Sequence, residues 1–541
     1  MMASTDTVKN ILDVFIQNSF LSVILVAVVC IVFIILIVLL IIVIIALAEG
    51  REIQLGFIKV GQRQKKTNEA ESNKADVSVS KEEIEKLRSE LKSLEKLCSK
   101  KLDYIERLAV LPNFEIPPSG ILRRISKNTD IIKDRVVLIR LDLEIPALED
   151  TDIEMKHFKF FRAAETLKVL TLHAKKIIIA FSQGSVKIDI AKTGYNYHGN
   201  HVKEIISLLN DTECKYQCLN NIDEISDFID SNNKIAFLPN LINIFPEENS
   251  FLNPISDTSK GIVNKLCKYV NMYILDDFRK NIYPLPLNTY ITNKIPSFIG
   301  LGLERDIKNL EFLVKKCISF GREEKKRIAI CGSLRPYDLH IIKSLLEYHL
   351  FDKVLLGPYP SIPFLMSQGV KVPNETREKL IGLCYEKALL FDEYVLKTIC
   401  KDTYEMYKNN ILLPDDFIDE KCESINIDEL EHHGIFPGND IFPGIGEKTI
   451  KKYQSECENA SLVFHFGMLG SALKKYRWVT QEIIKSYKNI LCFTAGDHIS
   501  MLAQEIGFTN RDTHFITGAQ TTAYFLSNKR LIGLSGFIEK Q

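Results

Sequence analysis

The sequence predicts an α/β protein in which two lobes, each built on a doubly wound parallel sheet, are joined by a helix. Short apolar runs bounded by charged residues recur between residues 136 and 516, as is typical of strands buried on both faces of a parallel sheet. Helical stretches such as Phe160–Leu172 separate the runs, which is the alternation that parallel strands need for their crossovers. A charged helical stretch, Glu304–Lys316, divides the runs into two sets.

We place the N-terminal lobe at residues 125–303, the joining helix at 304–320 and the C-terminal lobe at 321–541. Both sheets are expected to be Rossmann-like, and such sheets bind ligands beyond the carboxyl ends of their strands. The strands expected in the first lobe are Val136–Ile139, Ile177–Ala180, Ile235–Leu238 and Met272–Leu275. Those expected in the second are Arg327–Cys331, Lys353–Leu356, Leu462–His465, Asn489–Phe493 and His514–Ile516.

A short segment, residues 1–19, precedes a run of 29 residues, 20–48, that contains no charged side chain. As a helix this run would be about 43 Å long, enough to cross the ~30 Å hydrocarbon core of a bilayer with some tilt. The apolar part of a cleaved signal peptide spans only about 7–15 residues, so the run predicts a permanent transmembrane helix. Five basic residues follow it before residue 67 and only Lys9 precedes it, so the positive-inside rule predicts a single-pass membrane protein with its C-terminal part in the cytosol.

Residues 49–80 predict a basic juxtamembrane segment and a flexible polar linker. From 81 to 110 apolar residues recur at alternating steps of three and four, with Lys101 interrupting one core position. This spacing predicts a short coiled coil and, through it, a homodimer. The alternative is a single amphipathic helix packed on the following domain. The apolar positions are Ile84, Leu87, Leu91, Leu94, Cys98, Ile105 and Leu108.

The composition limits the classes of partner. Lys and Arg together number 69, as do Asp and Glu, so the charge of the whole chain gives no reason to expect nucleic acid. The twelve cysteines are scattered, and no second pair or nearby histidine joins Cys214 and Cys218 to complete a zinc site. We therefore expect free thiols in a reducing compartment.

The stretch R-V-V-L-I-R-L-D-L-E-I-P, residues 135–146, brings an arginine, a carboxylate and a proline to the end of the first strand. It resembles the N-terminal signature of the phosphoglycerate kinase family, R-V-D-x-N-x-P. Further pieces that resemble the family pattern follow in the family's order. They are K-I-I-I-A-F-S-Q-G from 176, L-P-N-L from 238, Y-I-L-D-D-F from 273, I-C-G-S-L-R from 330, L-L-P-D-D from 412, G-I-G-E-K-T from 444, G-D at 496 and T-G at 517.

The resemblance implies the two-lobed phosphoglycerate kinase fold. It also implies phosphoryl transfer between 1,3-bisphosphoglycerate and ADP, with magnesium, across a cleft between the lobes. Such catalysis depends on positioning and on positive charge around the transferring phosphoryl group. The acid phosphate needs arginine and histidine side chains as well, because guanidinium groups match phosphate and carboxylate geometry.

Several of the cations that the resemblance implies are neutral here. Phe160 stands where the family has its catalytic arginine, and the adjacent Lys159 is a poor replacement because neighbours on a helix point about 100° apart. Asp142 and Gly184 remain as remnants of the substrate site, and Glu144 replaces an asparagine. We expect such a site to repel a bisphosphorylated acid. The other neutral replacements are Ser182, Ser185, Ile242 and a position near Tyr283.

The nucleotide side is less altered. Arg335 can replace one family lysine, and Asp497 is kept where the resemblance implies a magnesium ligand. Ala519 and Gln520 replace glycines that let the backbone approach phosphate at a helix N-terminus. Magnesium and ADP or ATP are therefore expected only if nucleotide binding is retained. The nucleotide-binding remnants are Gly332, Arg335, Gly357, Gly496, Asp497, Thr517 and Gly518.

The retained residues also have plain structural interpretations. Asp142 can serve as a cap or hydrogen-bond acceptor at a strand end, and Asp497 can serve as the N-cap of the helix that follows it. The segment G-I-G-E-K-T suggests a phosphate-binding P-loop, but it lacks the G-x-x-x-x-G-K-[ST] spacing.

These observations predict a membrane-anchored, phosphoglycerate-kinase-like pseudoenzyme. We expect it to act as a scaffold for an unknown protein partner or as a ligand sensor, and Arg335 and Asp497 favour the sensor over a pure scaffold. The alternative is a divergent but active phosphoglycerate kinase tethered to a membrane.

Overall fold

The computed structural model divides the chain into two compact units, Met1–Pro112 and Asn113–Gln541. In the first unit, β1 (Ile53–Leu55) and β2 (Ile58–Val60) form an antiparallel hairpin. The hairpin lies in the predicted juxtamembrane segment and was not expected, although apolar and polar residues alternate in both strands. The residues that the structure describes are 53–55, 58–60, 121–127, 129–144, 158–182, 197–209, 214–248, 255–332, 339–374, 400–430, 443–471, 474–508, 512–529 and 531–539.

The predicted transmembrane helix at 20–48 and the predicted coiled coil at 81–110 lie outside the described residues. Within the part of the chain that is described, no helix has both the length and the apolar composition of a membrane span.

The N-terminal lobe is built on a six-stranded, entirely parallel sheet with the order β5-β6-β4-β3-β7-β8. All four predicted strands are confirmed. The two strands that were missed, β5 and β8, are the edges of the sheet, and each has only three residues. The strands are β3 (Val136–Leu141), β4 (Lys176–Ala180), β5 (Tyr216–Cys218), β6 (Ile235–Phe237), β7 (Met272–Asp276) and β8 (Ser297–Ile299).

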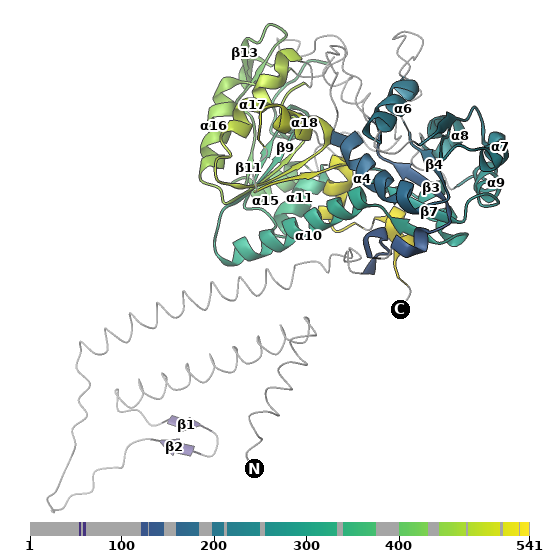
Figure 1. Ribbon diagram of the computed structural model, residues 1–541. Coiled ribbons are helices and arrows are strands. Elements are labelled where there is room, and N and C mark those ends of the chain that lie inside the picture. The colour runs from purple at the N-terminus through teal and green to yellow at the C-terminus, as the bar shows by residue number, and fades with distance from the viewer. Residues whose placement is uncertain are drawn as a thin grey trace, which may run out of the picture. The chain divides into compact units, whose positions relative to one another are not determined.

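Helices cover both faces of this sheet, which is why β3 is buried along its whole length (Figure 1). Val137, Ile139 and Leu141 pack with α4 (Phe158–His173) and α6 (Tyr197–Leu208) on one face. Leu138 lies in the core cluster on the other face, together with residues of α7 (Ile225–Asp230) and α9 (Asp257–Leu266). The alternation follows from the two-residue period of a strand. The lobe also contains η2 (Ile125–Lys127), η3 (Thr129–Ile132), η4 (Ile222–Glu224), α8 (Leu241–Ile244), η5 (Pro246–Glu248), η6 (Pro286–Tyr290) and η7 (Ile291–Asn293).

The C-terminal lobe has a second parallel sheet of six strands, ordered β11-β10-β9-β15-β16-β17. The five predicted strands are confirmed, with one shift: the strand expected from Asn489 begins at Leu491, because Asn489 has a left-handed φ of 59°. The strands are β9 (Arg327–Cys331), β10 (Lys353–Leu356), β11 (Ile411–Leu412), β15 (Leu462–Phe466), β16 (Leu491–Ala495) and β17 (Thr513–Ile516).

An unpredicted antiparallel sheet of three short strands, ordered β13-β12-β14, belongs to the same lobe. Its members are β12 (Asp416–Ile418), β13 (Ser424–Asn426) and β14 (Gly444–Ile445). The described helices of the lobe are α11 (His340–Glu347), α12 (Pro358–Ser367), α15 (Lys401–Tyr407), η10 (Ile427–Glu429), α16 (Glu447–Glu458), η11 (Lys474–Tyr476), α17 (Arg477–Lys485), α18 (Asp497–Glu505) and α19 (Ala519–Leu526). A last short helix, η12 (Ile532–Phe537), follows α19.

The lobes are joined by α10 (Leu301–Arg322), which is longer at both ends than the predicted helix at 304–320. It contacts β7 in one sheet and β9, β15 and β17 in the other (Figure 1). Its start is fixed by Asp276 at the end of β7, whose carboxylate accepts a hydrogen bond from the Leu303 backbone N–H at 2.6 Å.

The chain crosses between the lobes a second time at its C-terminal end. There η12 packs against η6 and β8 of the N-terminal lobe, and Ile538 forms a bridge with Leu122. The N-terminal lobe therefore includes residues before its predicted start at 125.

Candidate functional site

The carboxyl ends of β3 and β7 deliver most of the charged side chains of the site. Because these two strands are parallel neighbours, the residues that follow them lie side by side. The backbone N–H of Asp142 donates to the carbonyl oxygen of Asp276 at 3.2 Å, which fixes the two strand ends together. Asp142 and Glu144 come from the first strand end, and Asp277, Arg279 and Lys280 from the second.

The first of two charge clusters, here called the buried charge cluster, consists of Arg140, Asp277, Lys280 and Glu248. Arg140 donates to both carboxylate oxygens of Glu248, at 2.5 and 2.9 Å, and to Asp277 at 3.0 Å. Lys280 donates to Glu248 and to Ser182, each at 3.0 Å. The side chains of Arg140 and Glu248 are both fully buried. The two cations therefore have carboxylate partners from their own chain.

The charges in this cluster stabilise the ionised forms of both Glu248 and Arg140. Burial opposes ionisation of Glu248, but Arg140 and Lys280 outweigh it and lower the pKa of its carboxyl group to about 2. Burial likewise opposes the charge of Arg140, whereas Glu248 and Asp277 raise its pKa. Glu248 and Arg140 are thus both charged at neutral pH.

The second cluster, the junction cluster, lies where the lobes meet and consists of Asp142, Glu144, Lys159, Arg279 and Asp497. The ammonium group of Lys159 donates to Asp142 Oδ1 and the Glu144 carbonyl oxygen, both at 2.9 Å, and to Asp497 Oδ2 at 2.7 Å. Arg279 donates to Glu144 and, at 3.4 Å, to Asp497. Asp142 and Asp497 raise the pKa of Lys159 against the opposing effect of burial, so this lysine stays protonated.

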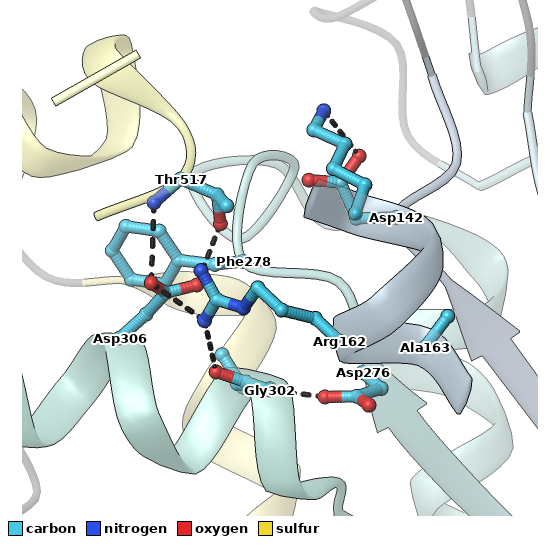
Figure 2. A pocket seen from close by; sticks show the side chains of 10 residues that line it. Asp142, Arg162, Ala163, Asp276, Phe278, Gly302, Asp306 and Thr517 are labelled. Atoms are coloured by element: carbon cyan, nitrogen blue, oxygen red, sulfur yellow. Dashed lines mark hydrogen bonds and ion pairs between the residues drawn. The ribbon is translucent and has the colours of Figure 1, made fainter. Parts of the chain in front are cut away.

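A third set of contacts ties three elements together beside the junction cluster. Asp306 on α10 accepts from the Thr517 backbone N–H at 3.1 Å and from its hydroxyl at 2.6 Å, and pairs with Arg162 of α4 at 2.9 Å. Figure 2 shows the Arg162 guanidinium group directed at the Asp306 carboxylate. The cavity between these groups measures about 20 Å³, roughly the room that one water molecule needs. Its lining residues are Asp142, Lys159, Arg162, Ala163, Asp276, Phe278, Gly302, Leu303, Asp306 and Thr517.

A family model described as phosphoglycerate kinase matches residues 127–529, which is most of the chain. The chain belongs to the phosphoglycerate kinase family. The match begins in the N-terminal lobe and ends just after α19, so it spans both sheets and α10. The family and the two-lobed fold predicted from the sequence are therefore confirmed.

The similarity to two relatives named phosphoglycerate kinase extends over nearly the whole length of each relative. The protein from Methanothermus fervidus is 24% identical over 404 residues, which are 73% of this chain and 92% of the relative. The one from Macrococcus caseolyticus is 25% identical over 424 residues, 76% of this chain and 98% of the relative. The crystal structure of phosphoglycerate kinase from Pyrococcus horikoshii shares the fold with a TM-score of 0.60 at 20% identity, covering 77% of this chain and 98% of its own.

The substrate side of the site in this chain can now be compared with the prediction. Phe160 does point away from the site, packing in the core and edge-on to His201, but Lys159 reaches the junction cluster. The two neighbours do point in different directions, as expected on a helix, and it is Lys159 that faces Asp142 and Asp497. Gly184 lies outside the described residues, and Ser182 accepts a hydrogen bond from Lys280.

Arg279, Lys280 and Glu248 were missed. Although family cation positions such as Phe160 and Ser182 are neutral, Arg140, Lys159, Arg279 and Lys280 bring four cations to the site. One signal was available for Arg279 and Lys280: they directly follow Y-I-L-D-D-F at the carboxyl end of a predicted strand. Nothing local marked Glu248, which is 108 positions from Arg140 and lies in η5.

On the nucleotide side, two of the predicted glycines are explained by backbone packing. A Cβ on Gly332 would lie 2.2 Å from the Met468 carbonyl oxygen, and one on Gly357 would lie 2.6 Å from the Gly332 Cα. Gly518 has a φ of 69° and approaches Arg279, where a Cβ would lie 2.9 Å from the Arg279 Cα. Arg335 lies outside the described residues.

Asp497 does not cap α18. The N-cap is Gly496, with a φ of 114°, and Asp497 is the first residue of the helix, with its carboxylate in the junction cluster. That alternative interpretation was wrong, because the ammonium of Lys159 competes for the carboxylate. Thr517, also predicted for the nucleotide site, is bound to Asp306.

The residues around Asp497 do not fit a magnesium ion. Mg²⁺ takes oxygen ligands at about 2.0–2.1 Å, and two side-chain cations already contact this carboxylate. The described residues contain no group of three or more His, Cys, Asp or Glu side chains arranged to hold a metal.

The segment G-I-G-E-K-T is also explained by structure. Asp416 occupies the N-terminus of α16, where its carboxylate accepts from the Thr449 backbone N–H and hydroxyl at 2.9 and 2.7 Å and from the Lys448 backbone N–H at 3.2 Å. A Cβ on Gly446 would lie 2.2 Å from the Asp416 carboxyl. An internal carboxylate thus takes the place that a phosphate would need.

We expect Asp416→Ala to lower the free energy of unfolding by about 2–3 kcal/mol, because two N–H groups and two hydroxyls lose a buried charged acceptor. Urea unfolding followed by circular dichroism measures this change. Asp428→Ala, the same substitution at an exposed site in η10, should change it by less than about 0.5 kcal/mol. Equal effects of the two substitutions would contradict the capping role.

Proposed function

We propose that this chain is a phosphoglycerate-kinase-like protein that does not turn over phosphoglycerate and works instead as an interaction or ligand-sensing module. The observation that carries the proposal is the pairing of its site cations. Arg140 and Lys280 are bonded to Glu248, and Lys159 and Arg279 to Asp142, Glu144 and Asp497.

Charge balance supports the proposal. The two clusters together contain four cations and five carboxylates: Arg140, Lys159, Arg279 and Lys280 against Asp142, Glu144, Glu248, Asp277 and Asp497. A phosphorylated acid needs cations whose hydrogen bonds are available, since a bond to a charged group contributes about 1.5–3 kcal/mol. Here it would have to displace internal carboxylates from a buried site, which leaves those carboxylates without partners.

Space supports it as well. Among the described residues, the cavity of about 20 Å³ beside the junction cluster accommodates roughly one water, which is less room than phosphoglycerate needs. We further propose that the run at 20–48 anchors the module in a membrane with its kinase-like part in the cytosol, and that residues 81–110 dimerise it. These two parts of the proposal rest on sequence alone.

A second candidate is a divergent, active phosphoglycerate kinase. One observation favours it: the Lys159 ammonium lies between Asp142 of one lobe and Asp497 of the other, where a cation can stabilise a transferring phosphoryl group. Two relatives are named phosphoglycerate kinase, and for this candidate the family resemblance implies ADP or ATP with magnesium.

The two candidates are separated by a coupled turnover assay on the full-length chain in mild detergent, with the Macrococcus caseolyticus enzyme as the active control. We expect a rate at least about 10³-fold below the control, because losing two charged phosphate contacts raises the barrier by about 4 kcal/mol. Turnover near the control rate that Lys159→Met abolishes would reject the proposal in favour of an enzyme.

Binding measured on the same sample distinguishes a ligand sensor from an interaction scaffold. Calorimetric titration with ADP–Mg²⁺ and, separately, with 3-phosphoglycerate reports which ligand is recognised. Binding of ADP–Mg²⁺ without turnover supports the sensor. A folded sample that binds neither ligand supports the scaffold.

A further inference from the structure

We propose that Lys159 and Arg279 form a latch with Asp497 that holds the two lobes together when no ligand is bound. The latch joins α4 and the loop after β7, both in the N-terminal lobe, to the first residue of α18 in the C-terminal lobe. It is independent of whether the chain has turnover, because it concerns the position of the lobes alone.

Lys159 is the central part of the latch. Its three ammonium protons match three acceptors: Asp142, the Glu144 carbonyl oxygen and Asp497. The first two acceptors belong to the N-terminal lobe and orient the lysine, and the third lies across the junction. The side chain of Lys159 is 1% exposed and that of Asp497 is 10% exposed. An ion pair this well shielded is little affected by salt.

Arg279 adds a second tie at the same carboxylate, 3.4 Å from Asp497 Oδ2, while Glu144 holds its other side. The backbone around Arg279 also contacts the C-terminal lobe. The Thr521 hydroxyl of α19 donates to the Arg279 carbonyl oxygen, and Gly518 leaves no room for a Cβ against the Arg279 Cα. The loop that carries Arg279 therefore makes one charged contact and two backbone contacts with the C-terminal lobe.

The same geometry explains why Asp497 does not fit a metal ion. A carboxylate that two internal cations neutralise has lost the charge that would attract a divalent cation, and opening the lobes would separate Asp497 from both Lys159 and Arg279. Their attraction to Asp497 across a shielded junction favours the closed arrangement without any ligand.

Hydrogen–deuterium exchange of the full-length chain in mild detergent tests the latch. In Lys159→Met, which keeps the length of the side chain and removes its charge, we expect exchange at least about tenfold faster in peptides that cover 278–281 and 518–522. Lys308→Met is the matched control, because Lys308 pairs with Glu304 within α10 and is 55% exposed. It should leave both peptides unchanged.

Asp497→Asn provides the reciprocal test, since it removes the charge on the other side of the junction while Lys159 keeps Asp142. It should accelerate exchange in the same two peptides and leave β15, in the core of the C-terminal lobe, protected. If Lys159→Met loosens β15 as well, Asp497→Asn decides the question. Unchanged exchange at 278–281 and 518–522 in Asp497→Asn would overturn the proposal.

Discussion

Replacing Glu248 with alanine is expected to lower the free energy of unfolding by about 3–5 kcal/mol, the usual result of removing one partner from a buried ion pair. Arg140 and Lys280 would both be left buried beside Asp277 as their remaining carboxylate neighbour in the cluster. Chemical denaturation monitored by circular dichroism measures the loss. Glu165→Ala is the control, because its pair with Arg305 is about half exposed and should contribute less than about 1 kcal/mol.

The pH dependence of stability gives a second measurement of the same contact. The folded-state pKa of Glu248, about 2, lies below its ordinary value of 4.5, so the carboxylate stabilises the fold above pH 4.5. About 3 kcal/mol of this stability should be lost as the pH falls from 4.5 to 2. In Glu248→Gln that part of the pH profile should flatten. An unchanged profile would show that Glu248 is not the acid-sensitive group.

Asp306→Ala is expected to have an effect of similar size, about 3–5 kcal/mol, since it leaves the buried Arg162 without its carboxylate. Thr517 loses an acceptor for both its N–H and its hydroxyl at the same time. Because Asp306 connects α4, α10 and the end of β17, both lobes should be destabilised together in denaturant unfolding (Figure 2).

Two further variants test whether the effect of Asp306→Ala comes from its charge. Asp306→Asn keeps an oxygen acceptor for Thr517 and loses the charge facing Arg162, so it should fall between wild type and Asp306→Ala. Asp257→Ala removes a solvent-exposed partner of Lys260 and should have no measurable effect. If Asp306→Ala proved as mild as Asp257→Ala, Arg162 would have to find another carboxylate in the folded protein.

The sheets could be predicted from the sequence because the strands at their centres are apolar on both faces. Val136–Leu141 and Leu462–Phe466 each form a single buried run, and burial on two faces requires such a pattern. The edge strand Tyr216–Cys218 is exposed at two of its three residues, so no hydrophobic pattern marks it. The small antiparallel sheet was not predicted for a similar reason, because its strands have only two or three residues each.

The candidate site was predictable only in part. Asp142 and Asp497 were selected by position in the family pattern, and the fold does bring both to the junction. What they contact could not be predicted, because the partner of a charge is decided by tertiary placement. Glu248 reaches Arg140 from η5, and Lys159 reaches Asp497 over 338 positions of sequence.

The contact of η12 with the N-terminal lobe has a consequence for how this domain can be connected to others. Glu539 donates its backbone N–H to the Ile121 carbonyl oxygen at 2.7 Å, and Leu122 pairs with Ile538. The point where the chain enters the domain and the point where it leaves are therefore neighbouring antiparallel segments. A domain whose two ends are adjacent can be inserted into a surface loop of a host protein without displacing either lobe. For the same reason it can be circularly permuted by joining those ends.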